Sequence, residues 1–193
     1  LIDLVIKNCN IKYKLIGTDY FPSAIGLYWV DKGFILPDIL KSDVDEKLWL
    51  EVLVDIINNQ KINIVLPGLD FEIPILSRNK HIIEKQTNAK IIVSSNEVVS
   101  MANDKWETVK YLKKNGYTYP KSCLPNNIKK FLKFQPYPLI VKPRFGHTSQ
   151  NISIVNHEAE LKEALKSCPS PIVQEYIGDI ESEYTCGSSY IND

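Results

Sequence analysis

The sequence carries no surplus of charge of either sign, since 23 Lys and Arg side chains balance 23 Asp and Glu side chains among 193 residues. A protein that binds nucleic acid non-specifically needs a clear positive surplus to neutralise phosphates. Long apolar runs are also missing, because the longest, such as 138–141, are a fraction of the ~20 residues that cross a bilayer. We therefore expect a soluble protein that binds neither nucleic acid nor a membrane.

Cysteine is sparse, and its spacing argues against two kinds of small domain. The four cysteines lie far apart and form no Cys-x-x-Cys pair: Cys9, Cys123, Cys168 and Cys186. Neither a zinc site nor a disulfide framework is expected, and reduced thiols indicate a cytoplasmic protein. Nothing resembles a signal peptide, and the chain begins at Leu1 inside an apolar run, so we expect its true start to lie upstream.

Strand and helix patterns alternate, with short connections, through the first hundred residues. Strands are expected at 13–19, 34–37, 61–67 and 90–93. The segment 1–9 is expected to be the tail of a helix, and further helices are expected after a cap at Ser42 or Asp43, at 71–86 and at 95–102. Such alternation favours a doubly wound parallel sheet, in which 61–67, apolar nearly throughout, is a strand buried on both faces.

Beyond residue 102 the pattern changes to that of an α+β domain. Asp104 and Glu107 have the spacing of a capping box, and the helix that they predict ends at Gly116. Further elements are expected as strands at 139–142, 151–155, 171–176 and 182–190, with a helix capped by Asn156 or His157 and ending near 167. We predict two domains, a parallel α/β domain at 1–102 and an α+β domain with an antiparallel sheet at 103–193.

The strand expected at 139–142 and the polar loop after it place a lysine and an arginine close together in the sequence. Lys142 and Arg144 stand at the end of the strand, and Gly146, Thr148 and Ser149 follow in the loop. Lysine is a point charge suited to phosphate oxygens, arginine is a fork suited to phosphate or carboxylate, and loop amides can form a nest for an anion. We interpret the segment as a phosphate site, against the alternative of a strand with two solvated cations.

Three further features each allow a structural and a functional interpretation. The strand 172–178 has a polar end that can hold the edge of a purine, or is a plain strand. Glu181 and Glu183 share one strand face, where an acid can accept from ribose hydroxyls or is simply solvated. Lys105 follows the helix cap Asp104, an unfavourable place for a cation unless an anion is nearby.

Taken in order, these segments resemble the ATP-grasp superfamily, and most of all the group similar to the carbamoyl-phosphate synthase large chain. The resemblance is carried by Asn-Asp-Lys ending at Lys105, by IVKPRFG at 140–146 and by VQEYIGDIESEYT at 173–185, after IGTD, ILPD, INIVLPGLD and IIVSS in the first hundred residues. It implies an α/β protein with a Rossmann-like pre-ATP-grasp domain at 1–102 and a truncated α+β ATP-grasp domain at 103–193.

The resemblance implies a role for each matching residue. Lys105 and Lys142 would contact the phosphates of ATP, and Arg144, the one expected catalytic residue, would hold the phosphates or an acyl-phosphate. The remaining expected nucleotide-binding residues are Gly146, Thr148 and Ser149 in a lid, Gln174, Glu175, Tyr176 and Ile177 at the adenine edge, and Glu183, less surely Glu181, at the ribose. Lids of this family contain several glycines, whereas Thr148 and Asn151 stand at two of those places here, which predicts a stiffer lid.

The implied activity is that of an ATP-dependent carboxylate–amine ligase. ATP phosphorylates a carboxylate, and an amine or other nucleophile then attacks the acyl-phosphate, with positioning and charge neutralisation supplied by the protein. No metal ligand is assigned within the chain, because those for Mg²⁺ are expected beyond Asp193, so the fragment alone is expected to be inactive. The expected partners are ATP and a small carboxylate, and a homodimer through the first domain is one assembly that we consider.

Two other functions stay open at the level of sequence. One is an NAD(P)-binding Rossmann oxidoreductase, because Asp19 at a strand end mimics the acid that grips a ribose, although no G-x-G-x-x-G is present. The other is a non-catalytic nucleotide-binding module that lacks the metal-binding half. A thermal-shift comparison of ATP with NAD⁺ distinguishes the oxidoreductase from a ligase. The residues that follow Asp193 distinguish the non-catalytic module from a ligase, because a Glu followed downstream by Glu-x-Asn would supply the metal ligands.

Overall fold

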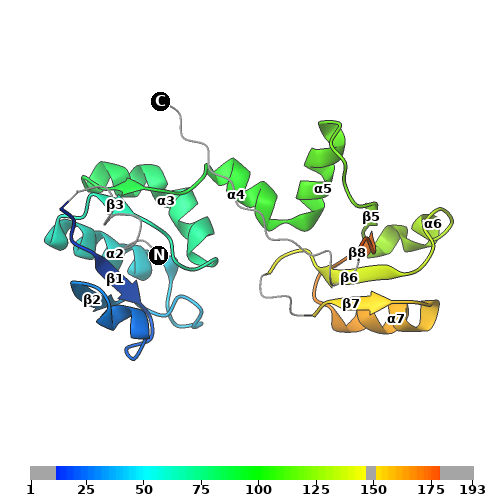
Figure 1. The fold of residues 1–193 in the computed structure, drawn as a ribbon, viewed down its shortest axis with the longest axis horizontal. Coiled ribbons are helices and arrows are strands. Elements are labelled where there is room, and N and C mark those ends of the chain that lie inside the picture. The colour runs from blue at the N-terminus through cyan, green and yellow to red at the C-terminus, as the bar shows by residue number, and fades with distance from the viewer. Residues whose placement is uncertain (1–11, 147–150, 179–193) are drawn as a thin grey trace. The chain divides into compact units, whose positions relative to one another are not determined.

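The computed structural model describes residues 12–146 and 151–178 (Figure 1). By internal contacts the chain divides into two compact units, one ending at Val93 and the other beginning at Ser94. The expected domain boundary at 102 and 103 stays a prediction, and the elements expected at 1–9 and 182–190 lie outside the described residues. None of the described helices has the length and apolar character that a membrane span requires.

The strands of the first unit run parallel, as predicted. They are β1 (Ile16–Asp19) paired with β2 (Lys32–Ile35), and β3 (Ile64–Val65) paired with β4 (Lys90–Ile91). The expected parallel α/β class is therefore confirmed, although the ladders of the described residues form two separate pairs and not one doubly wound sheet.

Two long helices and a short 3₁₀ segment complete the first unit: α2 (Glu46–Gln60), α3 (Glu72–Gln86) and η1 (Ile25–Tyr28). The prediction of Ser42 or Asp43 as the cap of α2 is wrong. Asp45 caps this helix, because its Oδ1 accepts a hydrogen bond of 2.6 Å from the amide of Leu48. The apolar period of α2 is confirmed by the burial of Trp49, Leu53, Ile56 and Ile57.

The strand predicted at 61–67 is shorter and more exposed than its apolar sequence suggests. Lys61 adopts a left-handed conformation with φ of 54° and ends α2, so the strand begins later, at Ile64. Within the described chain β3 pairs only with β4, and the side chain of Ile64 is 59% exposed. Burial on both faces, which a central parallel strand would have, is therefore absent here.

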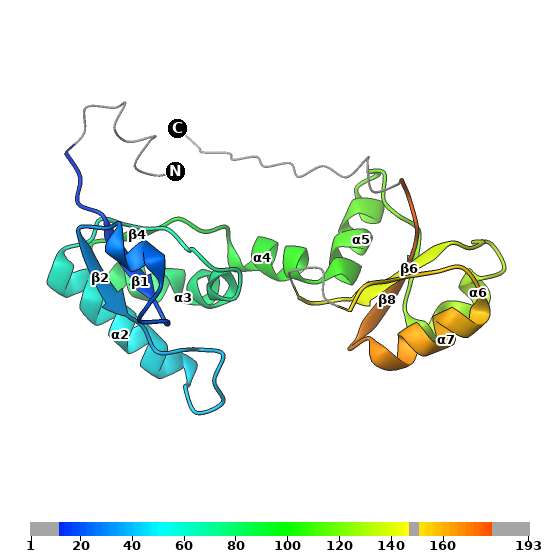
Figure 2. The same cartoon turned by 60° about the horizontal axis from the view of Figure 1, so that its bottom comes forward.

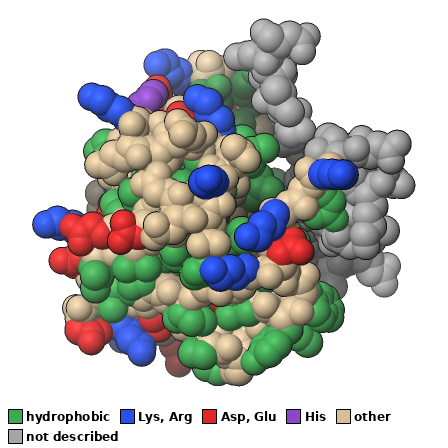
Figure 3. Space-filling view, turned by 90° about the vertical axis from the view of Figure 1, so that its left-hand side faces the viewer, with side chains coloured by type: hydrophobic (Ala, Val, Ile, Leu, Met, Phe, Trp, Pro, Cys, Tyr) green, Lys and Arg blue, Asp and Glu red, His purple; other side chains and the backbone are tan. Residues whose placement is uncertain are grey.

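Large apolar side chains also reach the surface elsewhere. On the face seen in Figure 3, hydrophobic side chains lie between charged groups of both signs. The most exposed large ones among the described residues of the first unit are Ile25, Tyr28 and Trp29, which follow β1, and Leu40. The interspersed charges agree with the balanced composition of the chain.

Among its described residues, the second unit is built on an antiparallel sheet of four strands in the order β5-β8-β6-β7. Its strands are β5 (Ser122–Cys123), β6 (Leu139–Pro143), β7 (Ser153–Val155) and β8 (Pro171–Glu175). Its helices are α4 (Asn96–Asn103), α5 (Lys105–Lys114), η2 (Pro125–Asn127), α6 (Ile128–Phe131) and α7 (Glu158–Ser167). The α+β class predicted for this part is confirmed; β5 and α6, short elements of the proline-rich segment, were not predicted.

The two faces of this sheet differ in character. One face packs against α6 and α7 in a core that contains Leu139, Val141 and Val173. Figures 1 and 2 show α5 on the other side of the sheet from α7. Because neighbours along a strand point to opposite faces, Ile140 and Lys142 project toward the side of α5.

Candidate functional site

Lys142 lies near the end of β6, on the sheet face opposite the α7 core. Its register partner on β8 is Ile172, and the adjacent pair on the same face joins Ile140 to Gln174. Directly paired residues of antiparallel strands project to the same side, so Lys142 and Gln174 share this face. The strand therefore carries a half-buried ammonium group toward the side of the sheet on which α5 lies.

Lys105 begins α5 and is tied by its main chain and its side chain to the segment after β6. Its amide donates to the carbonyl of Arg144 at 3.1 Å. Its Nζ donates to the carbonyl of Gly146 at 3.2 Å and lies 3.5 Å from that of Arg144. The two lysines expected from sequence are thus brought to the same end of β6.

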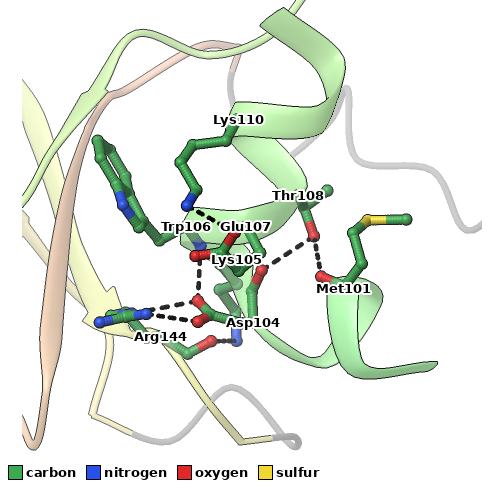
Figure 4. A network of polar contacts seen from close by, with 8 residues as sticks. All are labelled: Met101, Asp104, Lys105, Trp106, Glu107, Thr108, Lys110 and Arg144. Atoms are coloured by element: carbon green, nitrogen blue, oxygen red, sulfur yellow. Dashed lines mark hydrogen bonds and ion pairs between the residues drawn. The ribbon is translucent and has the colours of Figure 1, made fainter. Parts of the chain in front are cut away.

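Asp104 connects the start of α5 to Arg144 (Figure 4). The carboxylate accepts from Nε of Arg144 at 3.1 Å through Oδ1 and from Nη2 through Oδ2. Oδ1 also accepts from the amide of Trp106 at 2.9 Å, so Asp104 caps the helix as well. The cap is predictable from the sequence, but the ion pair is not, since nothing in the local pattern links residues so far apart in the chain.

The electrostatics of the site follow from burial and from these contacts. Burial lowers the pKa of Lys142, and the positive charge of Lys105 lowers it further. Burial acts to raise the pKa of Asp104, but hydrogen bonds from Arg144 and the Trp106 amide and the charge of Arg144 outweigh it, so this pKa is lowered. The hydrogen bond to Asp104 raises the pKa of Arg144. The site thus holds a fixed ion pair beside two cations that repel each other.

The loop expected to close over a nucleotide is described only at its two ends. Gly146 has φ of +114° and Asn151 has φ of +56°, and both residue types tolerate this left-handed region. Phe145 packs under the guanidinium of Arg144, whose Cζ lies 5.3 Å from the ring centroid. Thr148 and Ser149 lie outside the described residues.

Gln174 and Glu175 are both engaged with β5 and its neighbour. Gln174 is buried, and its Nε2 donates to the hydroxyl of Ser122 at 2.8 Å. Oε1 of Glu175 accepts from the amide of Lys121 at 2.7 Å, and Oε2 lies 3.9 Å from the ammonium of the same lysine. Lys121 and Ser122 could not be found from the sequence, because β5 is too short to leave a periodic pattern.

The other residues expected to hold the nucleoside lie at and beyond the end of β8. The amide of Tyr176 is 3.4 Å from the carbonyl of Pro138, and Ile177 is largely exposed. Glu181 and Glu183, expected at the ribose, lie outside the described residues. Among residues 12–146 and 151–178, no group of three or more His, Cys, Asp or Glu is placed to hold a metal ion.

Two family models match the chain in succession. The model described as a PylC-like N-terminal domain matches residues 1–92, and the model described as an ATP-grasp domain matches residues 102–185. The second match contains Lys105, Lys142 and Arg144, and hence the cluster around the start of α5 and the end of β6.

Curated relatives span more than this chain does. An uncharacterized protein of Mycoplasma genitalium is 33% identical over 149 residues, which are 74% of this chain and 50% of the relative. Coenzyme gamma-F420-2:alpha-L-glutamate ligase of Methanococcus maripaludis is 34% identical over 88 residues, 42% of this chain and 31% of the relative. The chain therefore spans half or less of the length of these relatives.

Solved structures share the fold of both parts. The biotin carboxylase domain of Hydrogenobacter thermophilus 2-oxoglutarate carboxylase, a dimer in complex with MgADP, ADP and bicarbonate, matches with a TM-score of 0.61 and 20% identity, over 91% of this chain and 41% of that chain. At this identity the match shows the fold alone. The family assignment comes from the two models, which together match most of the chain and support an ATP-grasp superfamily protein, in which a PylC-like N-terminal domain precedes an ATP-grasp domain.

Proposed function

We propose that this chain is the ATP-binding part of an ATP-dependent carboxylate–amine ligase that acts through an acyl-phosphate. One observation carries the proposal: Lys105 and Lys142 come together at the end of β6, where the positive charge of one lowers the pKa of the other. Two cations held close together in a partly buried place are destabilising unless an anion lies between them. The phosphates of ATP are such an anion.

The two lysines would act by binding and neutralising phosphate oxygens. In this structure Nζ of Lys105 donates to the carbonyl of Gly146, a neutral acceptor. A phosphate oxygen carries charge and forms the stronger hydrogen bond, so the ammonium would exchange the carbonyl for the nucleotide. Lys142 would contact the same phosphates from the sheet.

Arg144 would hold the transferred phosphoryl group or the acyl-phosphate with the donors that Asp104 leaves available. Nε and Nη2 of the guanidinium donate to the carboxylate. A guanidinium has five N–H donors in a fixed fork, and no described residue accepts a hydrogen bond from Nη1, so we assign that edge to an anion.

The nucleoside would lie against the end of β8. Because the side chains of Gln174 and Glu175 are held by Ser122 and Lys121, we assign the adenine edge mainly to the main chain of Tyr176 and Ile177. Glu183, with Glu181 as the second choice, would hold the ribose, and Gly146, Thr148 and Ser149 would close over the phosphates.

In the proposed reaction an oxygen of the acceptor carboxylate attacks the γ-phosphorus, and ADP leaves. The nitrogen of an amine then attacks the acyl carbon, and inorganic phosphate leaves with the electron pair of the broken C–O bond. Mg²⁺ would supply further charge neutralisation in such a reaction. No group of three or more His, Cys, Asp or Glu among the described residues is placed to hold a metal ion, and we propose that the ligands of Mg²⁺ lie elsewhere in the protein.

The name of the Methanococcus maripaludis relative, a glutamate ligase, supports a ligase function for the ATP-grasp part. The narrower likeness to the carbamoyl-phosphate synthase large chain stays a prediction, as do the homodimer and the small carboxylate substrate.

The proposal is tested by isothermal titration of the intact protein with ATP. Because Lys142 would contact the phosphates, Lys142→Ala should lower the affinity for ATP at least about tenfold, the scale of a lost charge-assisted hydrogen bond. Lys129→Ala, which removes an exposed lysine of α6, should leave it unchanged. An unaltered affinity in Lys142→Ala, or stronger binding of NAD⁺ than of ATP, would refute the proposal.

A further inference from the structure

We infer that Asp104 is a positioning residue, which sets the two phosphate-binding lysines relative to each other by holding Arg144. The inference rests on the proposed function and adds to it a residue that the sequence indicated only as a helix cap. Asp104 would not touch the nucleotide. It would act through the two segments that its carboxylate joins.

The carboxylate of Asp104 is linked to both lysines without contacting either of them directly. Lys105 is the residue directly after Asp104, and Lys142 lies near the end of β6, two positions before Arg144, which follows that strand. Asp104 binds the guanidinium through two oxygens, while the carbonyl of Arg144 accepts from the amide of Lys105. The ion pair, which Figure 4 shows, and this main-chain bond close a ring of contacts between the start of α5 and the end of β6.

Further hydrogen bonds hold Arg144 and Asp104, the two residues of the ion pair, in place. The amide of Arg144 donates to the carbonyl of Ser170 at 3.0 Å, just before β8. The hydroxyl of Thr108 lies 3.1 Å from the carbonyl of Asp104 and 3.0 Å from that of Met101 in α4. The position of Asp104 is therefore defined from the helix side as well as from the sheet side, as a positioning residue requires.

Capping of α5 does not by itself explain the contacts of Asp104. A cap needs one side-chain oxygen, and Asp45 caps α2 in this way through its bond to the Leu48 amide. Asp104 makes the equivalent bond to Trp106 and in addition binds Arg144, with only 8% of its side chain exposed. Burying an ion pair contributes little net stability, so such a pair is better explained by the geometry that it fixes.

The test uses the intact protein and compares ATP with adenosine, which has the same base and ribose but no phosphate. Asp104→Asn keeps the cap, because Asn also caps helices, and removes the charge that holds Arg144. We expect the affinity for ATP to fall about tenfold, and that for adenosine, followed by ligand-observed NMR, to stay unchanged. Asp104→Ser, a second cap-preserving change, should give the same result if the Asn variant folds poorly.

Asp45→Asn is the matched control, since it makes the same substitution at the cap of α2, and it should change neither affinity. A double variant, Asp104→Asn with Arg144→Gln, should bind ATP no more weakly than the weaker-binding single variant, because both changes break the same ion pair.

The inference is overturned if the Asp104 variants bind ATP as the wild type does, or lose ATP and adenosine affinity equally. A wild type that binds no ATP overturns the proposed function as well, whereas normal ATP binding that depends on Lys142 but not on Asp104 overturns this inference alone.

Discussion

Lys142 is a cation that the fold partly removes from water and sets near a second cation. Burial and the charge of Lys105 both lower its pKa, so the ammonium form is less favourable here than in water. Charged side chains in such places are usually paired, and the nearby carboxylate of Asp104 is bound to Arg144. Residues held in an unfavourable state are typical of binding sites, where stability is given up for function.

This reasoning predicts that Lys142→Met stabilises the protein without nucleotide, by ~0.5 kcal/mol, the lower end of what favourable substitutions give. Chemical denaturation of the two proteins at pH 7 measures the gain. The depressed pKa also fixes the sign of the pH dependence: the wild type is penalised while the folded-state ammonium is charged. The difference should therefore disappear as the pH rises toward 10.5, the ordinary value for lysine.

A gain that persists above that pH would show that the added apolar contact, and not the removed charge, stabilises the variant. A loss of stability at pH 7 would contradict the account of Lys142 altogether.

At the scale of elements, β6 places its side chains according to the two-residue period of a strand. Leu139 and Val141 are fully buried in the core with α7, while Lys142 projects toward the side of α5. The same strand thus anchors the sheet and presents the cation. Its function depends on its register, because a shift by one residue would exchange the two faces.

Leu139→Ala should accordingly cost about 2–5 kcal/mol in the free energy of unfolding, the range for large-to-small changes in a packed core. Ile154→Ala on the neighbouring strand β7 is the control, since that side chain is 47% exposed and its loss should cost at most ~0.5 kcal/mol. Equal costs measured by urea denaturation would show that the core does not lie on the α7 face.

The elements that sequence predicts well are those whose signals are local. The period of α2 and the helix expected from 95 onward are read from neighbouring residues, and so is the cap of α7, which was expected at Asn156 or His157 and is His157. The wrong cap of α2 shows the limit of such reading, because several acceptors precede this helix and only geometry selects Asp45. β5 could not be predicted, since its two residues are defined by pairing with β8.

At the scale of the whole molecule, the order of the two structural classes along the chain is predictable from sequence, whereas the ion pair between Asp104 and Arg144 in the site is not. A parallel α/β part followed by an antiparallel part follows from the spacing of apolar segments, and both are confirmed. The lysines and Arg144 were identified by the chemistry of their side chains. The bond from Asp104 to Arg144 joins α5 to β6 and depends on the tertiary fold, which a local pattern does not encode.

The central claim is that Lys105 and Lys142 lie against the phosphates of one nucleotide. An acyl-phosphate derivative of ATP, which transfers its acyl group to lysines beside the bound phosphates, tests this directly when the labelled peptides of the intact protein are identified by mass spectrometry. The account predicts that Lys105 and Lys142 are acylated and that excess ATP, but not NAD⁺, suppresses both modifications together. ATP-sensitive labelling that falls on other lysines and spares both of these would contradict it.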